Sequence, residues 1–107
     1  MRKIYRQGDV LLIEVDNETL FEGKKQERDN QGRLVLEYGE VTGHAHAFYH
    51  QGVNLTLIQG GLRILETEEE SILKHEEHAD IILPAKKKFK IVRQVQYTPE
   101  RIIQVAD

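Results

Sequence analysis

Residues 39–50 read Gly-Glu-Val-Thr-Gly-His-Ala-His-Ala-Phe-Tyr-His. In an extended strand successive side chains point to opposite faces of a sheet. The alternation therefore places three histidines on one face together with Phe48: His44, His46 and His50. Imidazoles gathered on one side of a strand are hard to explain as solvated surface, so we expect a functional site on this face.

Short alternating or apolar stretches flank this strand on both sides and are separated by turn signals. The expected strands are residues 4–15 with a bend at Gly8-Asp9, then 33–38, 44–50, 53–59, 62–67, 72–75, 80–83 and 89–97. Gly60-Gly61 is a strong hairpin signal. Many short strands with close turns predict an all-β fold, namely a small antiparallel barrel or sandwich.

The remaining composition limits the class of protein. A chain of 107 residues is expected to form one domain over residues 1–107. Thr98-Pro99 suits a helix start, so a short C-terminal helix or extension is expected after it. Without cysteine there is no disulfide and no cysteine metal site. No stretch has the apolar run of a signal peptide or membrane span, which predicts a cytoplasmic protein without a membrane partner.

Charge is unevenly distributed, although the net charge is only -3. Residues 66–80 are mostly acidic, and residues 86–101 are mostly basic. Such runs usually mark solvated turns. A surface that attracts anions is the alternative.

The two remaining histidines form a second cluster in Lys74-His75-Glu76-Glu77-His78. Because His75 and His78 differ in parity, a regular strand would point them to opposite faces. We expect one of the two, and preferably His78, to join His44 and His46. His50 lies beside a turn and is equally well explained as a structural residue.

Paired imidazoles titrate near neutral pH and can act as general base and general acid on a phosphodiester. Cleavage also needs a cation for the developing oxyanion. Arg93 stands among apolar neighbours in residues 89–97, where a charge must be paired or reach a ligand. The expected substrate-binding residues are Arg6, Arg93, Lys90 and Tyr97, the last through stacking on a base.

These residues predict a metal-independent enzyme that cleaves RNA or a small cyclic oligonucleotide, with His44, His46, His75 and His78 as catalytic candidates. The alternative is a cupin-like protein that holds a divalent metal through His44, His46 and His78. A third class is a nucleotide- or protein-binding module without catalysis. The sequence leaves a homodimer open.

Two resemblances accompany these hypotheses. The glycine followed by His-x-His resembles the first cupin motif, but Gly39 is one residue too close to His44 and His50 stands where the glutamate belongs. The blocks RQGDV, GEVTGHAH, HEEH and RQ-x-x-YTP resemble a largely uncharacterised family of short bacterial β-proteins. That resemblance implies that the blocks belong together and implies no activity.

Overall fold

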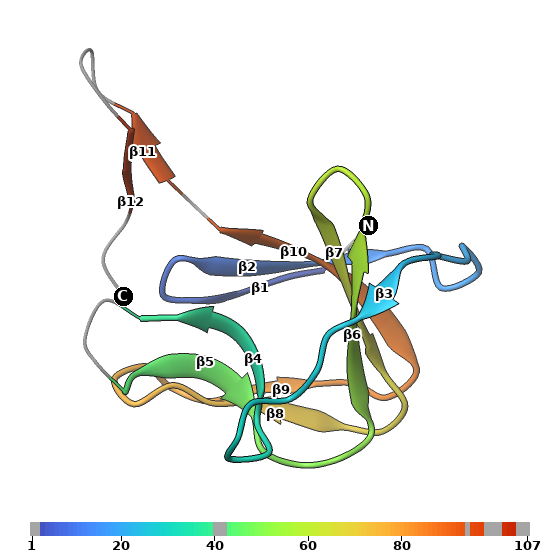
Figure 1. The fold of residues 1–107 in the computed structure, drawn as a ribbon, viewed down its shortest axis with the longest axis horizontal. Coiled ribbons are helices and arrows are strands. Elements are labelled where there is room, and N and C mark those ends of the chain that lie inside the picture. The colour runs from blue at the N-terminus through green and yellow to red at the C-terminus, as the bar shows by residue number, and fades with distance from the viewer. Residues whose placement is uncertain (1–2, 40–42, 94, 98–101, 105–107) are drawn as a thin grey trace.

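The computed structural model describes residues 3–39, 43–93, 95–97 and 102–104 (Figure 1). Over these residues the secondary structure is entirely β, and the strands pair antiparallel. The predicted all-β antiparallel fold is therefore confirmed. No helix in the described part of the chain has the length and apolarity to cross a membrane.

A six-stranded sheet forms one side of the molecule, with the strand order β1-β2-β10-β7-β6-β3. Its strands are β1 (Ile4–Gln7), β2 (Val10–Val15), β10 (Lys87–Arg93), β7 (Leu62–Thr67), β6 (Val53–Ile58) and β3 (Lys24–Lys25). The predicted hairpin at Gly60-Gly61 joins β6 to β7, and both glycines have positive φ. Positive φ is readily adopted only by glycine.

Two strand pairs lie across from this sheet (Figure 1). They are β4 (Leu34–Tyr38) with β5 (Ala45–Phe48), and β8 (Ser71–Leu73) with β9 (Ile81–Leu83). A bridge between Ala47 and Lys74 joins β5 to β8, with two backbone hydrogen bonds of 3.0 Å. The two pairs together make a second layer, as in a sandwich.

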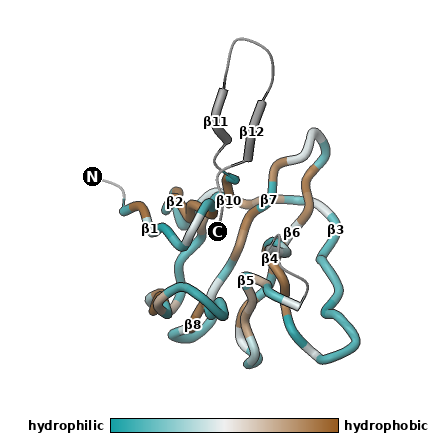
Figure 2. Tube along the Cα trace, turned by 90° about the vertical axis from the view of Figure 1, so that its left-hand side faces the viewer, coloured by the Kyte–Doolittle hydropathy of each residue, from teal (hydrophilic) through white to brown (hydrophobic). Residues whose placement is uncertain are grey.

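The core fills the space between these layers and draws on both. Its fully or nearly buried members are Val10, Leu12, Leu34, Leu36, Phe48, Val53, Leu55, Leu65, Leu73, Leu83, Phe89 and Ile91. Figure 2 shows the hydrophobic residues along the strands and a hydrophilic connection between β3 and β4. Burial of alternate apolar side chains from both layers supplies the main stabilising free energy.

One prediction about local structure is wrong, and the structure decides between two alternatives for another segment. Residues 4–15 do not form one bent strand, because Gly8-Asp9 reverses the chain and Gln7 pairs with Val10. Of the two alternatives for the C-terminal segment, a short helix or an extension, the described residues show the extended one: Ile102–Gln104 form β12, which pairs with β11 (Val95–Tyr97). The β-branched Ile102 and Ile103 favour a paired strand over an isolated helical turn. The proposed helix start at Thr98-Pro99 lies outside the described residues.

Candidate functional site

The tight turn between β1 and β2 lies directly against the histidines. Gly8 has a φ of 59°, which a two-residue hairpin with glycine at its first central position requires. A Cβ at Gly8 would lie 2.8 Å from Nε2 of His78 and 3.2 Å from Cε1 of His46. Glycine therefore gives this turn its conformation and lets the backbone approach both rings.

Four histidines gather above this turn, and we call them the histidine cluster: His44, His46, His75 and His78. Because Ala47 pairs with Lys74, His46 and His75 are the next cross-strand neighbours. Their ring centroids are 4.3 Å apart, and the His75 and His78 rings are 4.7 Å apart. The His44 ring lies 5.7 Å from that of His75. Both later histidines therefore lie in the cluster, where only one was expected.

His46 is fully buried and is held by Gln7, which is also buried. The side-chain amide of Gln7 donates hydrogen bonds to the carbonyls of Leu73 (3.0 Å) and Ala79 (2.9 Å). Its Oε1 lies 2.8 Å from Nδ1 of His46. Since a carbonyl oxygen only accepts, Nδ1 of His46 carries a proton. Gln7 thus sets the ring orientation of His46 and joins β1 to the segment around β8.

A network of charged side chains contacts His46 through Asp9. The carboxylate of Asp9 is fully buried, with Oδ1 3.6 Å from Nε2 of His46 and Oδ2 2.8 Å from Nε of Arg93. Arg93 Nη1 also contacts Glu37 Oε1 at 3.0 Å, and Arg63 Nη2 contacts Glu37 Oε2 at 2.9 Å. A buried charge is tolerated when it is paired. Arg93 is therefore engaged by two carboxylates of the protein itself.

The outer edge of the cluster brings together His44, His75 and Glu76. One donor atom from each of these residues lies within 4.8 Å of the other two. Burial acts to raise the pKa of Glu76, but the N–H groups of Ala45 and Glu76 and the neighbouring His44 and His75 lower it overall. The backbone N–H of Ala45 donates to Oε1 of Glu76 at 2.9 Å. Glu76 is therefore ionised at neutral pH, with two imidazoles beside it.

Comparison with known proteins gives a family and no activity. The family model described as "Domain of unknown function (DUF8820)" matches residues 6–94. The chain belongs to the DUF8820 family. Neither the search of curated proteins nor the search of solved structures finds a match. Membership of an uncharacterised family agrees with the expected resemblance, whereas the cupin likeness and the individual sequence blocks remain predictions.

The region matched to DUF8820 contains the whole histidine cluster but ends before Tyr97, whose side chain lies outside the described residues. His50 lies beyond Phe48, with the two ring centroids 6.3 Å apart, and its carbonyl accepts a hydrogen bond from Arg28. Lys90 is exposed on the face of β10 opposite the buried Phe89. These contacts place neither His50 nor Lys90 against the histidine cluster.

Arg6 lies two residues before Gly8, whose turn packs against His46 and His78. It is exposed, and its Nε donates to the carbonyl of Gly8 at 2.9 Å. The sequence patterns assign no role to Gln7 or Asp9, although both prove to contact His46. A usable signal is present, because Gln7 and Asp9 flank the turn glycine Gly8 just before the apolar run that begins at Val10.

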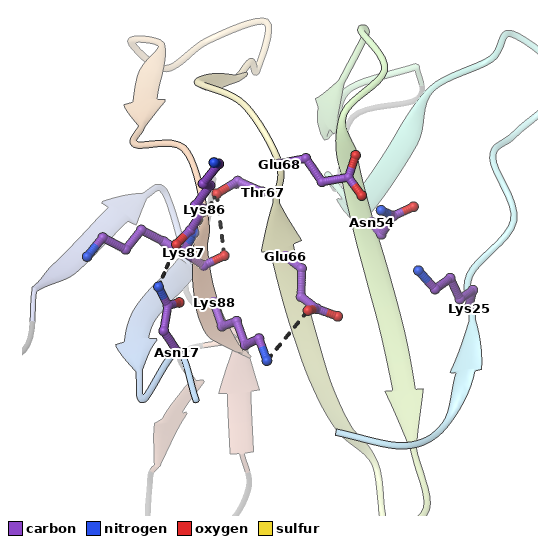
Figure 3. A pocket seen from close by; sticks show the side chains of 9 residues that line it. All are labelled: Asn17, Lys25, Asn54, Glu66, Thr67, Glu68, Lys86, Lys87 and Lys88. Atoms are coloured by element: carbon purple, nitrogen blue, oxygen red, sulfur yellow. Dashed lines mark hydrogen bonds and ion pairs between the residues drawn. The ribbon is translucent and has the colours of Figure 1, made fainter. Parts of the chain in front are cut away.

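The basic run after Pro84 lines a different hollow, of about 270 Å³, over the face of the sheet formed by β3, β6, β7 and β10 (Figure 3). Two of its lysines form ion pairs with carboxylates of the protein. Lys88 Nζ lies 3.7 Å from Oε1 of Glu66, and Lys87 Nζ lies 3.3 Å from Oε2 of Glu14. The side-chain amide of Asn17 donates to the carbonyl of Lys86. This hollow therefore fits a surface of mutually paired charges better than a ligand site.

Proposed function

We propose that this protein binds a divalent transition-metal ion through His44, His75 and Glu76. The observation that carries the proposal is that their donor atoms lie within 4.8 Å of one another. Two imidazoles with one carboxylate are a donor set for zinc and for non-haem iron. Of the metal ligands expected from the sequence, only His44 belongs to this set. His46 is not included because it is fully buried and its Nδ1 is bonded to Gln7.

The local charges support a cation rather than an anion. Glu76 and Glu77 stand at the edge of the cluster, and Oε1 of Glu77 lies 3.8 Å from Nδ1 of His44. Arg93, one of the expected phosphate ligands, is held by Asp9 and Glu37. A site surrounded by carboxylates attracts a metal ion and repels a phosphate.

The remaining histidines would orient the metal ligands. The rings of His46 and His78 pack on His75 and limit its rotation. The backbone N–H of Glu77 donates to Nδ1 of His75 at 3.0 Å, so the neutral ring carries its proton on Nε2. Binding of a metal at Nδ1 would replace this hydrogen bond. Contacts that fix the orientation of a ligand ring, as the packing of His46 and His78 on His75 does, increase metal affinity in other proteins.

Isothermal titration of untagged, EDTA-stripped protein with Zn²⁺ tests this proposal. We expect one site, and we expect His44→Gln, His75→Gln and Glu76→Gln each to weaken binding by more than about tenfold. His50→Gln is the matched control, because it removes an imidazole that the proposal does not use. If the three variants bind zinc as tightly as the unchanged protein, the proposed site is wrong.

Metal-independent cleavage of RNA or a small cyclic oligonucleotide is the second candidate. The observation in its favour is the pair of His44 and His75, with ring centroids 5.7 Å apart and His44 partly exposed, because one imidazole can act as base while its neighbour acts as acid. Such cleavage should persist in EDTA and should leave a 2′,3′-cyclic phosphate. Failure to cleave either substrate in EDTA would eliminate this candidate and leave the metal proposal intact.

A further inference from the structure

We propose that the hollow beside this metal site binds a single nucleotide, with the phosphate between the metal ion and Lys74 and the base on Tyr49. This inference rests on the proposed function, because the metal ion provides one of the two phosphate contacts. The hollow has a volume of about 370 Å³ and is lined by Tyr49, Lys74, His75, Glu76 and Asp80. Two of these residues are proposed metal ligands, and the volume suits one small molecule.

Lys74 is firmly placed by its backbone but only weakly engaged by its side chain. Its N–H and carbonyl both bond to Ala47 at 3.0 Å, which fixes the position of the backbone beside β5. Its Nζ lies 3.1 Å from Asp80, and both side chains are about half exposed (49% and 48%). An ion pair with this exposure contributes little stability, so a phosphate can replace Asp80 as its partner.

Tyr49 has the features of a stacking platform. It is 53% exposed, although it follows the fully buried strand β5. The Tyr49 hydroxyl is the main cause that raises the pKa of the neighbouring Arg33, and Arg33 in turn pairs with Asp29 at 2.8 Å. The hydroxyl end of the ring therefore lies beside a paired guanidinium, while a large part of the ring is open to solvent. An exposed and oriented aromatic ring is a common site for base stacking.

The charges predict that the nucleotide binds only after the metal. Glu76 and Asp80 line the hollow and would repel a phosphate. A divalent ion on Glu76 reverses the local charge and leaves Lys74 as the second cation. We therefore expect ordered binding, with the metal first.

Titration of the full-length protein with adenosine 5′-monophosphate tests this inference. We expect binding to zinc-loaded protein and none to EDTA-treated protein. Tyr49→Leu and Lys74→Met should each weaken binding by about tenfold or more while leaving zinc affinity unchanged. Tyr38→Leu and Lys90→Met are matched controls, because both residues are exposed and lie outside the hollow.

The possible results separate the two proposals. If zinc does not bind, the metal proposal fails and the nucleotide inference fails with it. If zinc binds but adenosine 5′-monophosphate does not, or if Tyr49→Leu and Lys74→Met leave its affinity unchanged, only the inference is overturned. Inorganic phosphate binding as tightly as the nucleotide would exclude the role of Tyr49. Adenosine binding as tightly would exclude the phosphate contacts.

Discussion

Replacing Arg93 by Met should strongly destabilise the protein. The guanidinium lies 2.8 Å from Oδ2 of Asp9, a carboxylate with no solvent exposure. It also contacts Glu37, but Glu37 keeps its second partner, Arg63, at 2.9 Å. Methionine fills a similar volume without a charge, so the loss of the pair with Asp9 should dominate.

The structure sets the size of this effect. Removing one partner of a buried ion pair costs about 3–5 kcal/mol, because the other charge stays buried. For 107 residues, an unfolding entropy of about 2.1 cal/mol/K per residue gives about 0.22 kcal/mol/K. Dividing the two values predicts a fall in Tm of about 13–22 °C.

Thermal melts followed by circular dichroism measure this fall. Lys90→Met is the matched control on the same strand, because Lys90 is exposed, and its Tm should change little. Adding Asp9→Asn to Arg93→Met should recover part of the loss, since the buried charge is then removed. A fall of less than about 4 °C for Arg93→Met would refute this account of the pair.

Two further substitutions test local features. Gly8→Ala should cost about 1–3 kcal/mol in urea unfolding, because it strains a φ of 59° and places a methyl group 2.8 Å from His78. Gly32→Ala should cost less, because its φ is also positive but no atom lies within 4 Å of the added group; equal losses would contradict the proposed crowding. Burial acts to raise the pKa of Asp29, but hydrogen bonds from Arg33 and Gln31 and the charge of Arg33 lower it overall, below its ordinary value of 3.8. Asp29→Asn should therefore be less stable than the unchanged protein above pH 3.8, and the difference in unfolding free energy should disappear as the pH falls through the pKa of Asp29 in the folded protein. A difference in stability that persists below this folded pKa would exclude the pair of Asp29 and Arg33 as the cause.

Much of the fold follows from local alternation. The pattern in residues 44–50 correctly separates Phe48, which lies in the main core, from Ala45 and Ala47, which pack with Val35 in a smaller cluster. The face on which each of these side chains lies follows from the period of two in a strand, so it can be predicted from neighbouring residues alone.

The contacts of the histidines could not be predicted in the same way. His75 and His78 would lie on opposite faces if they belonged to one continuous strand. However, β8 ends at Leu73 and the chain then bends, so this rule does not apply to them. The pair of Asp9 and Arg93 joins residues 84 positions apart in the sequence. A pair between residues so far apart cannot be predicted from the alternation of side chains within one strand. The pair depends on the chain reversal at Gly8, where the sequence pattern predicts only a bend.

Anomalous diffraction at the zinc edge, from crystals of zinc-loaded untagged protein, tests the central claim most directly. The metal proposal predicts one peak at about 2.0–2.2 Å from donor atoms of His44, His75 and Glu76. A peak bound instead by His46 and His78, or no peak at the cluster, would contradict it.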